Sequence, residues 1–298
     1  MTDSFSFKSQ IAFVAGQIET ALETHLPQPE GEHAVVAEAM RYVALGGGKR
    51  LRPFLVVETA RMLGGDIENA LIVGCALECL HVYSLVHDDL PCMDDDDLRR
   101  GKPTVHKAYD EAIAVLAGDG LLTHAFALLG CEDAHPDPSV RAKLVCELAQ
   151  KGGVSGMIGG QVIDITVSES DRDEALITRL QAMKTGALID FAVKAGGIVS
   201  GADDATLNAL SAYARDMGLA FQIQDDILDV EGDAALMGKA VGKDENLGKA
   251  TFVSLLGLEE AKEKAKALGK QAKGHLAPFG EKAQTLKETV DFVLQRQH

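Results

Sequence analysis

The sequence LIVGCALECLHVYSLVH, residues 71–87, places apolar side chains on nearly every side when it is drawn as a helix. A helix of this composition is surrounded by other helices in the centre of a protein. Glu78 and His81 interrupt the apolar run, which is also too short to span a bilayer. The stretch therefore predicts a buried core helix.

The rest of the chain also favours helix. Prolines at 27–29, 91, 103, 136–138 and 278 separate long stretches without strand patterning. Residues 207–228 repeat apolar side chains on one helical face, and the chain from Glu259 onward is amphipathic. The best β-branched run, residues 162–167, has flanks of helical character. No repeat or linker is visible, so we predict one all-α domain over residues 1–298, a bundle of long helices.

Composition narrows the classes of function. The chain has 298 residues, a net charge of −16 and 46% hydrophobic residues, which excludes disorder and disfavours nucleic acid and anionic lipid as bulk partners. Its five cysteines are an odd number without disulfide-like spacing, as expected in a reducing compartment. The first residues lack the basic segment and apolar run of a signal peptide. We therefore predict a cytoplasmic protein without membrane insertion.

Two acidic motifs depart from the helical pattern: HDDLPCMDDDDLRRGKPTVH (87–106) and QDDILD (224–229). Asp225 and Asp229 are four residues apart, so both project from one helix face and repel each other unless a cation lies between them. Mg²⁺ is the expected cation, because it prefers oxygen ligands such as these two carboxylates. In the first motif, a bulge at Pro91 and Cys92 would return Asp94 to the vicinity of Asp88. The alternative is a solvated acidic face.

Basic residues recur beside these acids. Lys49, Arg50 and Arg52 lie in GGGKRLRP (46–53), Arg99 and Arg100 follow the first motif, and Lys239 and Lys249 follow the second. In an acidic protein this grouping suggests an anion with several charges, such as diphosphate. Taken alone, GGGKR is better explained as a glycine helix stop followed by a solvated basic turn, and it lacks the spacing of a nucleotide-binding P-loop. The nearby histidines and cysteines do not have the spacing of a structural zinc site.

At this point the motifs match a known family. Together with GGQVIDI (159–165), KTGALI (184–189) and FQIQDDILD (221–229), they resemble the short-chain bacterial trans-polyprenyl diphosphate synthases over nearly the whole chain. The resemblance implies an isoprenoid synthase-like bundle around a deep central cavity, usually as a homodimer. It also implies Mg²⁺-dependent head-to-tail condensation of isopentenyl diphosphate with dimethylallyl or geranyl diphosphate. The main products would be farnesyl diphosphate and diphosphate.

The resemblance also assigns roles to individual residues. It implies roughly two to three Mg²⁺ ions per active site, with the ligands Asp88, Asp94, Asp225 and Asp229. The residues expected to bind isopentenyl diphosphate are Lys49, Arg52, His81 and Arg100. The residues expected to bind the allylic diphosphate are Arg99, Lys184, Thr185, Gln224, Lys239 and Lys249. The first four of these are also the expected catalytic residues. Gln161 and Asp164 are further candidates to face the cavity.

Product length is expected to depend on Tyr83 and Ser84, five and four residues before Asp88. At 1.5 Å per residue, Tyr83 lies roughly 7 Å further along the helix than Asp88. A ring at that depth would stop a chain whose diphosphate is anchored at the metal. In the family, an aromatic residue five positions before the first Asp and a two-residue insertion in the first acidic motif occur in enzymes whose products stop at fifteen carbons. The alternative is a core aromatic without a role in chain length.

Two other functions share some of these features. A class I terpene cyclase also carries an Asp-rich motif on a helical fold, but it binds one diphosphate and has no need of GGGKRLRP. A catalytically inactive regulatory subunit would be expected to lose carboxylates, whereas both motifs are complete. The sequence therefore favours the prenyltransferase.

Overall fold

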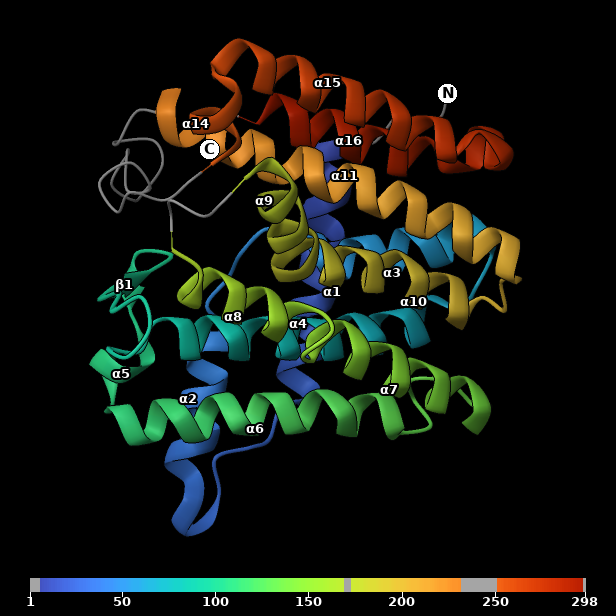
Figure 1. Cartoon of the computed structure of the whole chain (residues 1–298). Helices are drawn as coiled ribbons and strands as arrows, with labels where there is room; N and C mark the ends of the chain where they lie inside the picture. Colours follow the sequence, from blue (N-terminus) through green and yellow to red (C-terminus); the bar gives the residue numbers. More distant parts are fainter. Residues whose placement is uncertain (1–5, 169–172, 232–250, 297–298) are drawn as a thin grey trace. The chain divides into compact units, whose positions relative to one another are not determined.

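The computed structural model describes residues 6–168, 173–231 and 251–296, and these are helical almost throughout, which confirms the predicted all-α class (Figure 1). Contacts group the chain into two compact units, residues 1–146 with 198–200, and residues 147–197 with 201–298. The organisation of the whole chain as one domain stays a prediction.

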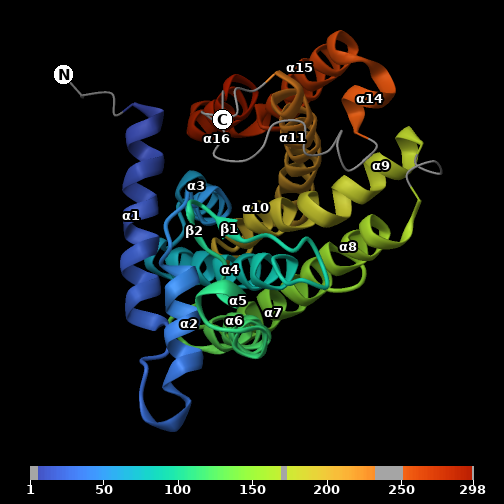
Figure 2. The same cartoon turned by 90° about the vertical axis from the view of Figure 1, so that its left-hand side faces the viewer.

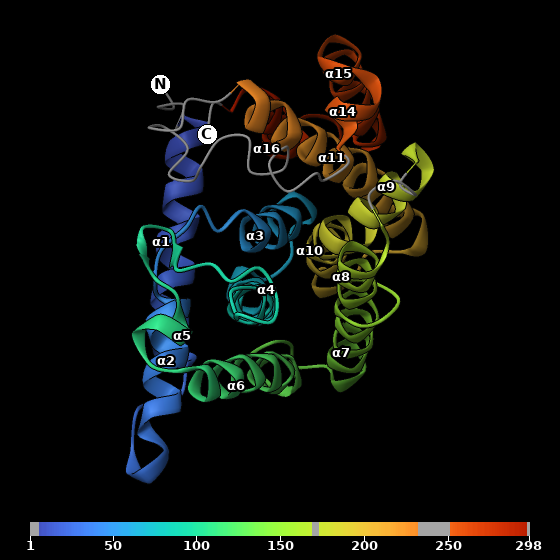
Figure 3. The same ribbon diagram turned by 60° about the vertical axis from the view of Figure 1, so that its left-hand side comes forward.

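The first unit is built around α4 (Ile67–Asp88), in which every residue from Ala70 to Leu80 is buried. Asp66 caps its start by accepting a hydrogen bond from the Asn69 backbone N–H at 3.1 Å. Figure 3 looks along α4, with α3 and α6 on opposite sides of it. This confirms the core helix expected from residues 71–87. The other elements of this unit are α1 (Phe7–His25), η1 (Gly31–His33), α2 (Ala34–Ala44), α3 (Leu51–Leu63), β1 (Leu98–Arg99), β2 (Lys102–Pro103), α5 (Val105–Ala108) and α6 (Glu111–Gly130).

Close helix contacts fix α4 in this unit. Helix α1 runs beside α3 and α4 (Figure 2), and a Cβ added at Gly74 of α4 would lie 3.0 Å from Ile18 and 3.2 Å from Pro53. On the other side, a Cβ added at Gly118 of α6 would lie 2.1 Å from the ring of His87. The His87 Nε2 atom instead lies 3.1 Å from the Val115 carbonyl oxygen. Gly74 therefore permits close packing in the first half of α4, and Gly118 permits it at the end of α4 that carries the first acidic motif.

Helices α4 and α6 are each long and apolar enough to cross a membrane by length and composition alone, which corrects the expectation that the run at residues 71–87 is too short to span a bilayer. In α4, 78% of the apolar window is buried inside the protein, as expected of a core helix. In α6 only 39% is buried, and Val115 and Leu116 are exposed. Helix α6 therefore presents an apolar face.

The second unit is built around α11 (Asp204–Glu231), with α15 and α16 alongside it (Figure 1). The buried Tyr213 hydroxyl donates to the Leu286 carbonyl oxygen at 2.9 Å and so links α11 to α16. Residues 162–167 belong mainly to a helix, which agrees with their helical flanks. Besides α7 (Pro138–Gly152), in which the unit boundary falls, the elements are α8 (Met157–Thr166), α9 (Glu174–Gln181), η3 (Ala182–Gly186), α10 (Ala187–Val199), α14 (Phe252–Leu256), α15 (Leu258–His275), η4 (Ala277–Ala283) and α16 (Gln284–Gln295).

Candidate active site

The first acidic motif forms a compact turn where α4 ends. Helix α4 ends at Asp88, and the backbone N–H of Asp94 donates to the Asp88 carbonyl oxygen at 2.8 Å. The extra residues Pro91 and Cys92 are accommodated because Leu90 accepts hydrogen bonds from Met93 and Asp95. This confirms the predicted bulge. The two residues expected to ligate Mg²⁺ are therefore joined directly through their backbones, despite lying six positions apart.

Asp89, between these two acids, has a different role. It is 2% exposed, and Arg99 contacts its Oδ1 atom through Nε at 2.7 Å and through Nη2 at 2.5 Å. Burial raises the pKa of Asp89, while the hydrogen bond and charge of Arg99 oppose the rise. Asp89 cannot be distinguished from its acidic neighbours by sequence alone. It is the anchor of Arg99, which the resemblance assigned to the allylic substrate.

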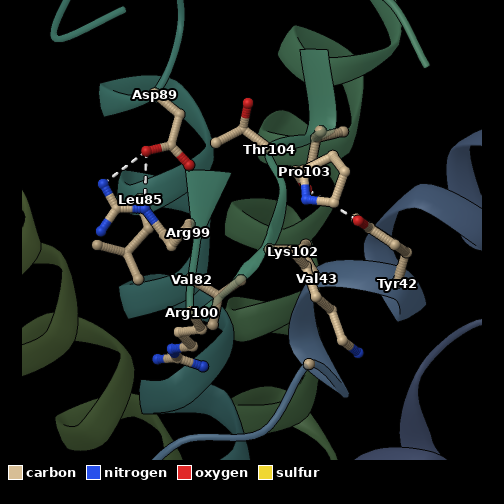
Figure 4. A pocket seen from close by; sticks show the side chains of 12 residues that line it. Tyr42, Val43, Val82, Leu85, Asp89, Arg99, Arg100, Lys102, Pro103 and Thr104 are labelled. Carbon is tan, nitrogen blue, oxygen red and sulfur yellow. Dashed lines mark hydrogen bonds and ion pairs between the residues drawn. The ribbon is translucent and has the colours of Figure 1, made fainter. Parts of the chain in front are cut away.

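Arg99 and Arg100 are presented by a short hairpin. Strands β1 and β2 pair in antiparallel fashion, with Arg99 opposite Lys102. The turn has positive φ angles at Arg100 (52°) and Gly101 (75°), the conformation favoured by two-residue hairpin loops. Figure 4 shows the two arginines with Lys102 around a pocket, which Tyr42 and Val43 also line. Cationic side chains are thus gathered beside the first motif within this unit.

The GGGKR segment is fixed by an arginine that the sequence analysis left without a role. Arg50 has a φ of 48°, and its side chain is fully buried. It donates to Glu19 at 2.7 Å, to Glu78 of α4 at 2.6 Å and to the Ala44 carbonyl oxygen at 2.5 Å. Burial lowers the pKa of Arg50, but the two carboxylates more than offset this effect and the pKa is raised. The GGGKR segment, which taken alone is expected to form a solvated basic turn, is therefore a junction in which the buried Arg50 pairs with two carboxylates.

The residues expected to bind isopentenyl diphosphate surround this junction. Arg100 donates to the Gly47 carbonyl oxygen, and a Cβ at Gly48 (φ 134°) would lie 2.9 Å from its guanidinium. The backbone angle at position 48 therefore favours glycine, and the absence of a Cβ leaves room for the Arg100 guanidinium. Lys49 follows directly and is exposed.

Arg52 and His81 meet in the same region. The Arg52 Nη1 atom lies 3.3 Å from the His81 Nε2 atom. Because a guanidinium can only donate, His81 accepts this bond through an unprotonated Nε2. Burial, followed by the positive charges of Arg52, Arg100, Arg99 and Arg50, holds the pKa of His81 well below its usual value. The structure therefore brings Lys49, Arg52, His81 and Arg100 to one place, with a neutral histidine among the cations.

Another group of possible metal ligands lies just beyond the first motif. The ligand atoms of Asp95, Asp97 and His106 are within 4.8 Å of one another. Lys107 already pairs with Asp97 at 2.8 Å, which partly neutralises the group. The Asp-rich segment can thus hold a metal by its donor chemistry. This cluster differs from the expected pair of Asp88 and Asp94.

Tyr83 is buried, and its ring meets that of His87 edge to face at a centroid distance of 5.7 Å. Burial, with a smaller contribution from Asp88, raises the pKa of Tyr83 to about 12, so the phenol is neutral. The Ser84 hydroxyl donates to the His81 carbonyl oxygen at 2.8 Å. Tyr83 therefore lies in the apolar part of α4 as expected, and its effect on product length stays a prediction.

The second motif lies in α11 of the other unit, where Asp226 and Asp225 have different surroundings. Asp226 is buried and accepts a hydrogen bond from the Phe252 backbone N–H at 2.8 Å, which anchors the start of α14. Asp225 is 47% exposed and pairs with Arg296 at 2.8 Å. Arg296 therefore supplies a positive charge beside Asp225, and the expected role of Asp225 and Asp229 as Mg²⁺ ligands stays a prediction.

Lys184 and Thr185 occupy a π-helical turn, Ala182–Gly186, between α9 and α10. Such turns often occur at functional sites. The Lys184 Nζ atom lies 2.7 Å from Asp164 Oδ2 of α8. A Cβ at Gly160 would lie 2.3 Å from the Lys184 backbone nitrogen, so glycine permits this approach. Gln224 is partly exposed on α11, and Lys239 and Lys249 lie outside the described residues.

Comparisons with known proteins identify the family of the chain. Residues 33–290 match the family model described as polyprenyl synthetase. The chain is 44% identical to a farnesyl diphosphate synthase of Geobacillus stearothermophilus, covering 94% of this chain and 95% of the relative. It is 43% identical to the farnesyl diphosphate synthase of Escherichia coli (strain K12), covering 97% and 99%.

A solved structure described as an apo FPP/GFPP synthase from Zymomonas mobilis is 49% identical, with a TM-score of 0.88 and coverage of 97% of this chain and 98% of that one. The all-helical fold is that of isoprenoid synthase-type prenyltransferases. The chain belongs to the polyprenyl synthetase family. This confirms the resemblance found from the sequence.

Proposed function

We propose that the protein is a prenyltransferase that joins isopentenyl diphosphate head to tail to dimethylallyl or geranyl diphosphate, with farnesyl diphosphate as its main product. The observation that carries the proposal is the cluster of Lys49, Arg52, His81 and Arg100 next to the turn that joins Asp88 to Asp94. A cationic set beside a carboxylate pair suits one diphosphate held directly and another held through metal. The names of the relatives support the same chemistry.

Mg²⁺ fits the proposed ligands Asp88, Asp94, Asp225 and Asp229, because they offer only carboxylate oxygens, which this hard cation prefers. When bound, it supplies positive charge that stabilises a diphosphate leaving group. The protein residues in contact with the allylic diphosphate are proposed to be Arg99, Lys184, Thr185, Gln224, Lys239 and Lys249. Arg99 and Lys184 are held by Asp89 and Asp164, respectively, so both cations are oriented before substrate arrives.

The reaction proceeds by loss of diphosphate from the allylic substrate, which breaks the C1–O bond and leaves an allylic cation. The double bond of isopentenyl diphosphate attacks that carbon, one carbon–carbon bond forms, and one proton leaves. His81 is a poor proton acceptor, since burial, and after it the positive charges of the arginines around it, hold its pKa well below the usual value. We assign the proton to the released diphosphate. The fixed cations Lys49, Arg52 and Arg100 keep the second diphosphate in place throughout.

Incubation of the purified protein with Mg²⁺, isopentenyl diphosphate and each allylic primer, followed by sizing of the products, tests this function. A prenyltransferase consumes isopentenyl diphosphate and gives a longer diphosphate. A terpene cyclase gives hydrocarbon or alcohol without consuming isopentenyl diphosphate, and an inactive subunit gives no product. The Asp88→Asn variant should lose turnover by orders of magnitude while keeping its helical circular dichroism spectrum.

We also propose a homodimer, because α6 leaves Val115 and Leu116 exposed, and α8 exposes Ile158, Val162 and Ile165 along one face. Faces of this kind in a highly charged protein are typical of contacts between chains. Light scattering should give twice the chain mass, and Leu116→Lys should reduce it to that of one chain. The proposed location is the cytoplasm, which agrees with five free cysteines.

A further inference from the structure

Arg296, directly after α16, contacts Asp225 of the second acidic motif and Phe221 one turn before it. Its Nη2 atom lies 2.8 Å from Asp225 Oδ1 and donates to the Phe221 carbonyl oxygen, also at 2.8 Å. The guanidinium carbon lies 3.8 Å from the centre of the Phe221 ring. The side chain is only 10% exposed. One cation from the end of the chain is thus seated on the helix turn that carries Asp225.

This position is energetically demanding for a guanidinium. Burial lowers the pKa of Arg296, and the charge and hydrogen bond of Asp225 oppose that effect. The guanidinium stays charged, since arginine does not lose its proton in proteins. The buried Nε atom has no hydrogen-bond partner within the described part of the chain. Asp225 is therefore the main counter-charge of Arg296, and separating the two would leave a buried cation unpaired.

The same carboxylate is the proposed metal ligand of the second motif. A divalent cation at Asp225 would meet a positive charge that already contacts Oδ1, so the metal must displace Arg296 or bind against its repulsion. We infer that Arg296 is an internal counter-ion that occupies Asp225 in the metal-free protein and lowers the affinity of the second motif for divalent cations. It is a positioning residue, and the inference rests on the proposed function of Asp225 as a metal ligand.

The arrangement has a consequence for binding order. In the absence of diphosphate, the metal gains only the carboxylates and must overcome the Arg296–Asp225 pair. When a diphosphate accompanies the metal, the additional oxygen ligands offset the loss of that pair. Arg296 therefore disfavours metal binding to the empty protein and favours joint binding of metal and diphosphate.

Binding of Mn²⁺ to the metal-free, full-length protein without substrate tests the inference, with free Mn²⁺ measured by electron paramagnetic resonance. The sites lost in Asp225→Asn define the second motif. For these sites, Arg296→Gln should bind Mn²⁺ roughly tenfold more tightly than the wild type, the factor that corresponds to about 1.4 kcal/mol. Arg296→Lys, which retains the charge, should stay close to wild type.

Lys273→Ala is the matched control, because it removes a cation paired with Asp291 of α16 without contact to the second motif. It should leave Mn²⁺ binding unchanged. Thermal melts of each variant establish that it is folded. An affinity of Arg296→Gln equal to or weaker than that of the wild type would overturn the inference.

A second measurement uses the wild-type chain and so does not depend on the folding of a variant. In arginine-labelled protein, the Arg296 guanidinium signal, identified by its loss in Arg296→Lys, should be protected from exchange without metal and lose protection as Mg²⁺ is added. Protection that persists at saturating Mg²⁺ would contradict displacement. If Asp225→Asn removes no Mn²⁺ site, the proposed ligand role fails. If it removes one that Arg296→Gln does not tighten, only the counter-ion inference fails.

Discussion

Glu78→Gln tests the buried junction that holds the GGGKR segment. Glu78 is 2% exposed in the middle of α4 and accepts a 2.6 Å hydrogen bond from Arg50, whose side chain is completely buried. The substitution removes one negative charge and leaves Glu19, itself 35% exposed, as the only carboxylate that the Arg50 side chain contacts among the described residues. The amide oxygen can still accept a bond, but it cannot compensate the charge.

The expected cost follows from this geometry. Removing one partner of a buried ion pair costs about 3–5 kcal/mol. Because Glu19 and the Ala44 carbonyl oxygen remain, we expect the lower end, about 3 kcal/mol. For a unit of this size that corresponds to a fall in Tm of about 6–12 °C. Since Lys49 and Arg52 flank Arg50, the KM for isopentenyl diphosphate should rise severalfold, with little change for the allylic substrate.

Thermal unfolding followed by circular dichroism gives Tm, and steady-state kinetics with each substrate varied in turn gives the two KM values. Glu58→Gln is the control, because Glu58 is equally buried in the same unit but pairs with the partly exposed Arg61. Burial raises the pKa of Glu58, so a neutral amide there should be tolerated with little loss of stability. A Tm for Glu78→Gln within about 2 °C of the wild type would refute the account of the junction.

Three further outcomes are expected. Tyr83→Ala should shift the products toward twenty carbons or more. The cavity it leaves should lower the free energy of unfolding by about 3–5 kcal/mol. Products that still end at fifteen carbons would show that another residue limits the chain length. Arg52→Ala should raise the KM for isopentenyl diphosphate, whereas Lys184→Ala should lower kcat or raise the allylic KM, and equal effects of both variants on both substrates would exclude the assignment. Because the folded protein holds His81 neutral while the unfolded chain protonates near pH 6.5, stability should fall as the pH drops below that value. His81→Gln should make urea unfolding less dependent on pH in that range, and an unchanged slope would argue against a depressed pKa.

The local features of the site were predictable because they depend on spacing along one chain. The apolar run at residues 71–87 required burial on all sides, and α4 provides it. The insertion of Pro91 and Cys92 between two acids required a bulge, and the Asp94–Asp88 backbone bond closes it. Helix periodicity likewise placed Asp225 and Asp229 on one face of α11. In each case the pattern and the contact lie within a few residues of each other.

What only the tertiary structure decided is which charges are paired. Nothing in six neighbouring aspartates distinguishes Asp89, which is buried against Arg99, from the acids beside it. Arg50 belongs to a segment that looks like an exposed basic turn, yet it is enclosed because α4 supplies Glu78 from 28 positions away. Arg296 reaches Asp225 from the far end of the chain. A charge is stabilised in a protein interior by whichever opposite charge folding brings to it, and that partner is set by the packing of helices distant in sequence.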